Sequence, residues 1–133
     1  MEKKIKNFIF KKYDDFWQAN IFFNSQQTTF EVYSEELNEE IILQIDTELD
    51  TKVLCIDKNA KYLLGELSTF FWLHNRNKVF TFSGFVIDEI TSKLFLDFRM
   101  CYHCYGNDNF SDFANWYIDI KDFRIVGCSR QQL

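Results

Sequence analysis

A stripe of apolar side chains in the middle of the chain most strongly limits what this sequence can fold into. Its members recur at alternating steps of four and three residues, a spacing that places them along one side of an α-helix. They are Leu49, Val53, Ile56, Ala60, Leu63, Leu67, Phe70 and His74. The spacing predicts one long helix from about residue 48 to residue 74, with Leu63 and Leu67 facing a sheet.

The ends of this helix carry signals of their own. Thr47 stands three residues before Asp50, which resembles a capping box, and Asn75 supplies stop chemistry after the stripe. Asp57 could cap a second, shorter helix from residue 58, so a break at this point stays open. The stripe could also form a coiled-coil dimer, but strand-like segments on both sides favour packing on a sheet.

Strand-like segments flank the helix on both sides. They are rich in aromatic and β-branched residues, and several alternate between apolar and polar positions. They cover residues 16–24, 28–33 and 41–46 before the helix, and 79–87, 94–105, 116–120 and 123–129 after it. The four residues from Asn24 suit a hairpin, Lys121 and Asp122 suit a tight turn, and 106–115 suits a connecting loop.

This order of elements predicts an α+β fold within a single domain, residues 1–133. We expect an antiparallel sheet of about 5–7 strands with one long helix, about 48–74, packed on one face. The expected order is β-β-β-α-β-β-β-β. The high aromatic content, with 16 Phe, 6 Tyr and 3 Trp, fits a Phe-rich core, although a few of these rings could instead line a ligand pocket.

The charge of the chain limits its partners. The net charge is −5, although five lysines fall within the first twelve residues, so the remainder is more acidic than the whole. An acidic body repels phosphate, so we expect no nucleic-acid partner. No stretch approaches the roughly 20 apolar residues of a membrane span, and the start lacks the apolar region of a secretory signal, so we expect no membrane partner.

The cysteines and histidines give no strong site. Cys101 and Cys104 form a single Cys-x-x-Cys around His103, and on a strand the two thiols would point to opposite faces. A structural zinc site commonly needs two such pairs. The other histidine, His74, ends the helical stripe. We therefore expect reduced thiols in a cytoplasmic protein, with no metal, no cofactor and no catalytic residue. These expectations favour a non-enzymatic protein over an enzyme.

Acidic side chains give the one candidate surface. A run of carboxylates follows the second predicted strand, and further aspartates lie in the last third of the chain beside an aromatic residue. Opposite charge steers a basic partner toward such a surface. The candidate partner-binding residues are Glu35, Glu36, Glu39, Glu40, Asp108, Asp112, Trp116, Asp119 and Asp122.

Two functional hypotheses follow from these observations. The first is a non-enzymatic intracellular protein-interaction domain, in its most concrete form a small acidic bacterial inhibitor or immunity-type protein that binds a basic partner. The alternative is a hot-dog-like or related α+β domain that holds a small apolar ligand in a Phe-rich pocket around Phe70, Phe71 and Trp72. The two differ in whether these rings enclose a cavity or fill a dry core.

Overall fold

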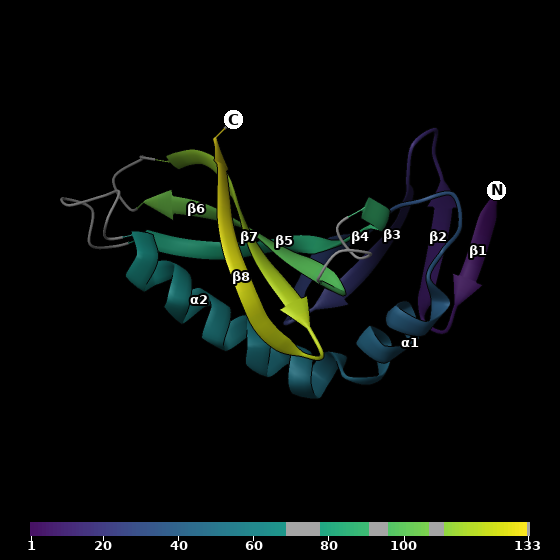
Figure 1. Cartoon of the computed structure of the whole chain (residues 1–133), viewed down its shortest axis with the longest axis horizontal. Coiled ribbons are helices and arrows are strands. Elements are labelled where there is room, and N and C mark those ends of the chain that lie inside the picture. The colour runs from purple at the N-terminus through teal and green to yellow at the C-terminus, as the bar shows by residue number, and fades with distance from the viewer. Residues whose placement is uncertain (69–77, 91–95, 107–110, 133) are drawn as a thin grey trace.

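Two antiparallel meanders of four strands each lie side by side in one sheet, whose spatial order follows the sequence from β1 to β8 (Figure 1). The structure is a computed structural model that describes residues 1–68, 78–90, 96–106 and 111–132, with the backbone alone at 78, 105, 106 and 111–113. The first meander comprises β1 (Glu2–Ile5), β2 (Phe8–Lys12), β3 (Trp17–Phe23) and β4 (Gln26–Tyr33). The second comprises β5 (Lys78–Asp88), β6 (Phe98–Gly106), β7 (Ser111–Lys121) and β8 (Arg124–Gln132).

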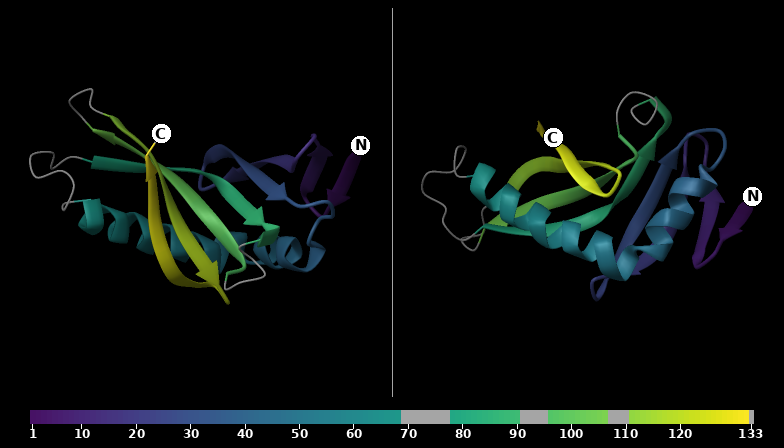
Figure 2. Two further views of the ribbon diagram at one scale, coloured as in Figure 1. Left: turned by 45° about the horizontal axis from the view of Figure 1, so that its top comes forward. Right: turned by 60° about the horizontal axis from the view of Figure 1, so that its bottom comes forward.

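The meanders are joined by β4 and β5, which pair in parallel, whereas every other neighbouring pair is antiparallel. A parallel pair needs a crossover, because the chain must return to the end where it started. The crossover contains α1 (Glu39–Thr47), the π-helical turn η1 (Leu49–Val53) and α2 (Leu54–Ser68). These elements run across one face of the sheet (Figure 2). The predicted α+β class with a mainly antiparallel sheet and a long helical segment is confirmed.

The prediction of a strand at 41–46 is wrong, because these residues form most of α1. Asn38 caps the helix, and its side chain accepts a hydrogen bond from the backbone N–H of Ile41 at 3.3 Å. Ile42 and Ile45, three residues apart, are fully buried. The run of isoleucine and leucine fits a strand period and a helix period equally well, and the cap decides between them.

The strand count and order also differ from the prediction. Four strands precede the helical crossover, because the lysine-rich start forms the hairpin β1–β2, with Lys6 in its turn at a φ of 54°. The sheet therefore has eight strands, in the order β-β-β-β-α-β-β-β-β. The helical segment begins at Glu39, earlier than predicted, and residues 69–74 of the predicted helix lie outside the described residues.

One predicted connection is tighter than the sequence indicated, and another is shifted by one residue. Asn24 and Ser25 have φ values of 52° and 62° and form the β3–β4 turn. Asp122 and Phe123, with φ values of 51° and 57°, form the β7–β8 turn, one residue later than expected. Two consecutive positive φ values are the geometry of a tight two-residue hairpin turn. Residues 111–115, expected in a loop, belong to β7.

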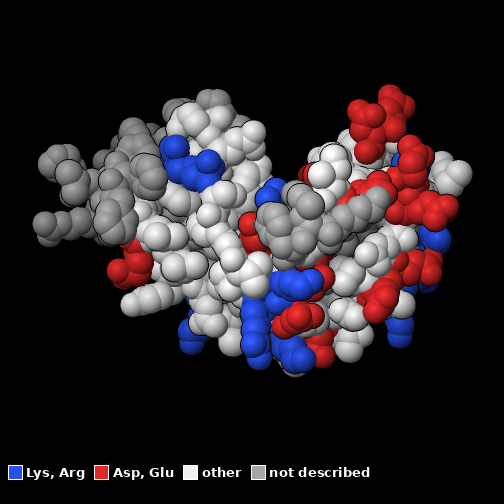
Figure 3. Space-filling view, viewed as in Figure 1, with Lys and Arg blue, Asp and Glu red and all other residues white. Residues whose placement is uncertain are grey.

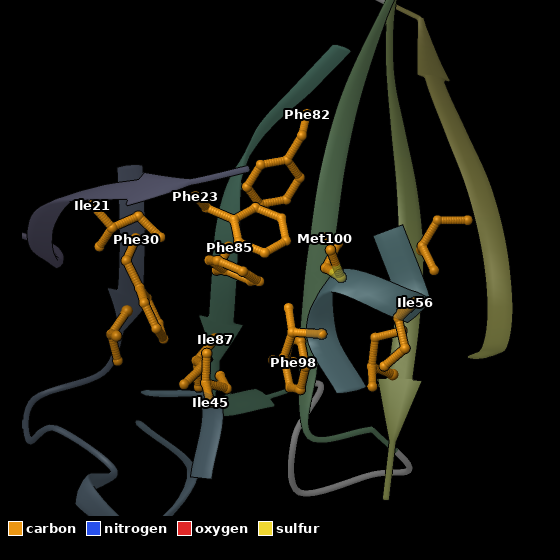
Figure 4. Close-up of a cluster of buried hydrophobic side chains, with 14 of the residues drawn as sticks. Ile21, Phe23, Phe30, Ile45, Ile56, Phe82, Phe85, Ile87, Phe98 and Met100 are labelled. Atoms are coloured by element: carbon orange, nitrogen blue, oxygen red, sulfur yellow. The ribbon is translucent and has the colours of Figure 1, made fainter. Parts of the chain in front are cut away.

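Aromatic rings from both meanders meet beneath the sheet and form the core (Figure 4). The ring centroids of Phe82 and Phe85 lie 4.8 Å apart, and Phe23 contacts both rings at 5.1 and 5.5 Å. Edge-to-face contacts of this kind stabilise a core beyond the area that they bury. The predicted inward face of β6, including Phe98 and Met100, is buried.

After Ala60, the buried residues of α2 are no longer the ones that the sequence spacing predicted. Leu64 is completely buried, whereas Leu63 and Leu67 are half-buried. The stripe therefore advances by four residues at this point, which shifts it toward the neighbouring side of the helix. A continuous helix of 3.6 residues per turn drifts in this way against a strict alternation of three and four.

A buried carboxylate ties α2 to both meanders. Asp57 is 2 % exposed, and its two oxygens accept hydrogen bonds from the Tyr102 hydroxyl of β6 at 2.7 Å and from the Asn24 amide at 3.2 Å. The ammonium of Lys61, one helical turn later, lies 3.1 Å from the same carboxylate. Burial and the neighbouring Asp57 raise the pKa of Tyr102 above its ordinary value, so its hydroxyl stays a donor. Because α2 begins at Leu54 and continues through Asp57, the possible break at this residue does not occur, and Asp57 does not cap a helix.

We predict that Leu64→Ala lowers the free energy of unfolding by about 2–5 kcal/mol, because it empties a completely buried site. Urea denaturation followed by circular dichroism measures this change. Tyr62→Ala is the control, since Tyr62 is 73 % exposed on the same helix. Its effect should stay within about 0.5 kcal/mol. Equal losses at the two positions would show that the buried side of α2 is assigned wrongly.

A second prediction concerns the buried carboxylate. Tyr102→Phe removes one donor from Asp57 while keeping the ring, and should cost about 1–3 kcal/mol of unfolding free energy. The matched control is Tyr117→Phe, whose hydroxyl donates to Gln131 at 3.0 Å on the exposed surface. That change should cost less than about 0.5 kcal/mol in the same denaturation experiment. A smaller loss at Tyr102 than at Tyr117 would contradict the bridging role of Asp57.

Candidate functional site

Carboxylates from separate parts of the chain gather around one hollow at the α1 end of the molecule, where Figure 3 shows many acidic side chains. We call this hollow, of about 620 Å³, the acidic hollow. Its acidic lining residues are Glu35, Glu36, Glu40, Glu89 and Asp97. Leu37, Ile41 and Ile87 add apolar surface. Among the described residues that line it, none is a lysine or an arginine.

Hydrogen bonds hold the β4–α1 connection that carries two of these carboxylates, Glu35 and Glu36. The indole N–H of Trp17 donates to the carbonyl oxygen of Glu35 at 3.2 Å, and the Ser34 hydroxyl donates to the carbonyl oxygen of Glu36. The side chain of Leu37 is buried and anchors the connection to the core. The backbone is therefore fixed while the carboxylates of Glu35 and Glu36 remain exposed.

The first turn of α1 places two more acidic residues at this end. Glu39 and Glu40 are exposed there, where carboxylates interact favourably with the positive end of the helix dipole. Glu39 lies 3.0 Å from the ammonium of Lys3 in β1 and does not line the hollow. Because both side chains of this ion pair are about half exposed, it contributes little to stability.

The aspartates predicted in the last third of the chain do not share one surface. Asp122 lies in the β7–β8 turn, and its backbone N–H donates to the carboxylate of Asp97 at 2.9 Å, so it adjoins the acidic hollow. Asp119 is 8 % exposed and pairs with Arg99 at 2.7 Å. Asp108 lies outside the described residues, as does the side chain of Asp112.

Trp116, expected beside the acidic surface, is 2 % exposed. Its ring packs edge-to-face against Phe80 at a centroid distance of 5.7 Å. The inward face of β7 therefore takes Trp116 into the core, whereas Tyr117 lies on the outer face of the same strand. Sequence reasoning missed Glu89 and Asp97 as members of the acidic hollow, because no local pattern shows that β5 and β6 meet the β4–α1 connection.

A second hollow of about 620 Å³ lies on the sheet face that the helices leave uncovered. We call it the open-face hollow. Its lining consists of residues from five strands. Their side chains point to the same face of the sheet, because side chains alternate between the two faces along a strand. These residues are Thr29, Glu31 and Tyr33 of β4, Ser83, Val86 and Asp88 of β5, Arg99, Cys101 and His103 of β6, Asn115 and Tyr117 of β7, and Gln131 of β8.

Polar contacts fix several of these side chains. Arg99 donates from Nε to Asp119 at 2.7 Å, and its guanidinium lies 5.5 Å from the centre of the Tyr117 ring. The Tyr33 hydroxyl donates to Glu31 at 3.0 Å. Burial, followed by this hydrogen bond, raises the pKa of Tyr33 to about 12. Tyr33 is therefore a neutral hydrogen-bond donor near neutral pH.

Cys101 and His103 share this hollow, yet the thiol is poorly suited to nucleophilic chemistry. Burial, followed by the nearby Glu31 carboxylate, raises the pKa of the Cys101 thiol to about 12. A nucleophilic cysteine needs the opposite shift, because the thiolate is the reactive form. Cys104 is buried on the other face, as the strand alternation predicted. Within the described part of the chain, no group of three or more His, Cys, Asp or Glu side chains is placed to hold a metal ion.

Comparison with known proteins finds no matching family model, no matching curated protein and no matching solved structure. Among the described helices, none has the length and apolar character needed to cross a bilayer. Phe70, Phe71 and Trp72, on which the hypothesis of a Phe-rich ligand pocket depends, lie outside the described residues.

The thiol environments predict an order of alkylation. Cys55 is exposed, whereas Cys101 is half-buried with a raised pKa. With iodoacetamide at pH 8, mass spectrometry should show Cys55 modified at least about 10-fold faster than Cys101, because thiolate is scarce far below the pKa. Raising the pH toward 12 should speed Cys101, and Glu31→Gln should speed it at constant pH. Equal labelling of Cys55 and Cys101 in the folded protein would contradict this assignment.

Proposed function

We propose that this protein is a non-enzymatic interaction domain that binds a basic partner protein through the acidic hollow. The observation that supports the proposal is the convergence of five carboxylates around one hollow in which no described lysine or arginine takes part. These carboxylates come from the β4–α1 connection, from the first turn of α1, from the residue after β5 and from the residue before β6. A basic side chain placed there would meet several negative charges at once.

The shape of the acidic hollow suits a protruding side chain or loop of a partner. Ile41 is half-buried at the hollow and offers an apolar contact to the hydrocarbon stem of a lysine or arginine. Carboxylates around the rim steer the partner into place and favour one orientation. In its narrower form, the proposal is a small acidic bacterial inhibitor or immunity-type protein that acts in the cytoplasm and blocks a basic toxin or enzyme.

The test compares two variants with the same net charge. In the hollow variant, Glu35, Glu36 and Glu40 are changed to Gln. In the control variant, Glu2→Gln, Asp50→Asn and Glu66→Gln remove three charges from residues that line neither hollow. The partner is first captured from extracts of the native host with the wild-type protein. Association rates are then measured for all three proteins across a salt series.

We predict that the hollow variant associates about 10-fold or more slowly than the wild type at low salt, because long-range attraction raises the encounter rate. The control variant should lose much less. The difference should shrink as the screening length falls to about 8 Å at physiological ionic strength. Unchanged thermal midpoints would show that both variants are folded. Equal losses in the two variants, or none in either, would refute the acidic hollow as the docking site.

A further inference from the structure

We propose that the open-face hollow is a second binding site, separate from the acidic hollow, and that it takes a small organic cation carrying a guanidinium or ammonium group. Its volume of about 620 Å³ is in the usual range of small-molecule sites. Its lining comes from strands of one sheet, of which β4, β5, β6 and β7 are paired on both sides. Most of its lining side chains are half-buried, so a bound molecule would lose much of its contact with water.

The fixed charges of this hollow favour a cation. Glu31 of β4 and Asp88 of β5 both line it, and Tyr33 and Asp88 are neighbours in the parallel ladder. Among the described residues that line the hollow, Arg99 is the one with a permanent positive charge, and the carboxylate of Asp119 lies 2.7 Å from it. The carboxylates are therefore left in excess, and an anionic ligand would be repelled.

Two aromatic rings complete the site. Tyr33 and Tyr117 line the hollow from opposite sides of β5 and β6. The guanidinium of Arg99 lies 5.5 Å from the centre of the Tyr117 ring, so a bound cation would contact this ring beside Arg99 or in its place. The hydroxyl of Tyr33 is held by Glu31, so the carboxylate and the ring are positioned together. Carboxylates beside aromatic faces are the surroundings in which proteins bind organic cations.

The remaining lining residues favour a small polar molecule over an apolar one. Thr29, Ser83, Asn115 and Gln131 provide hydroxyl and amide groups, whereas Val86 is the one aliphatic side chain that the described part of the chain adds to the lining. The raised pKa of the Cys101 thiol makes it a poor nucleophile, and the proposal for this hollow is therefore binding and not catalysis. The proposal does not depend on the basic protein partner, because the two hollows use different residues.

The probes for the test are agmatine, which carries a guanidinium and an ammonium, and tetramethylammonium. Calorimetric titration at low salt should give saturable binding of one equivalent. Glu31→Gln should weaken agmatine about 10-fold or more, because it removes a charge-assisted hydrogen bond. Tyr117→Leu should weaken tetramethylammonium about 3-fold or more, whereas Tyr117→Phe, which keeps the ring, should not.

Two controls locate the binding site. Asp50→Asn removes one exposed carboxylate from the helical side, and Glu35→Gln removes one from the acidic hollow. Neither substitution should change the affinity for agmatine or tetramethylammonium. A neutral isostere of agmatine, or glutarate as an anion, should bind far more weakly. The proposal is overturned if these uncharged or anionic probes bind as well as agmatine, if neither cation binds up to about 10 mM, or if Glu35→Gln weakens binding while Glu31→Gln does not.

Discussion

The parallel pairing of β4 with β5 is the constraint on which the rest of the structure depends. A meander can continue antiparallel with short turns, but a parallel neighbour requires a long crossover. The crossover begins with the acidic connection and then covers one face of the sheet with α1, η1 and α2. The same pairing therefore places the carboxylates of the acidic hollow beside β5, and leaves the opposite face of the sheet open for the second hollow.

A glycine allows this pairing to form. A Cβ atom on Gly84 would lie 2.6 Å from the carbonyl oxygen of Thr29, closer than any side-chain carbon can approach. The ladder between β5 and β6 is also irregular between Phe82 and Gly84. The backbones of β4 and β5 approach closely because this position has no side chain. On the other side of the sheet, Asp57 connects the crossover to Asn24 and Tyr102, one residue in each meander.

Some of this fold could be predicted from the sequence because the period of the side chains was unambiguous. Alternation in β6 correctly separated Phe98 and Met100 from Arg99 and Cys101. Residues 41–46 were predicted wrongly, since four apolar residues in six satisfy either period, and the cap from Asn38 is a single hydrogen bond. The hollows were beyond prediction for another reason. Their residues come from strands far apart in sequence, and only the pairing order brings them together.

The same pairing order has a consequence for how the chain folds. Each meander forms through contacts between near neighbours in sequence, which is fast because little chain entropy is lost in closing short loops. Thr29 and Gly84, by contrast, are partners across a long stretch of chain, so we expect their pairing to form after the short-range contacts. Until then the first meander exposes the aromatic side chains of Phe23 and Phe30 and an unpaired edge at β4, two features that promote association between partly folded chains. That exposed surface is flanked by charge, from the lysines of β1 and β2 and from the carboxylates after β4. Such charges limit aggregation before the helical crossover packs on the sheet.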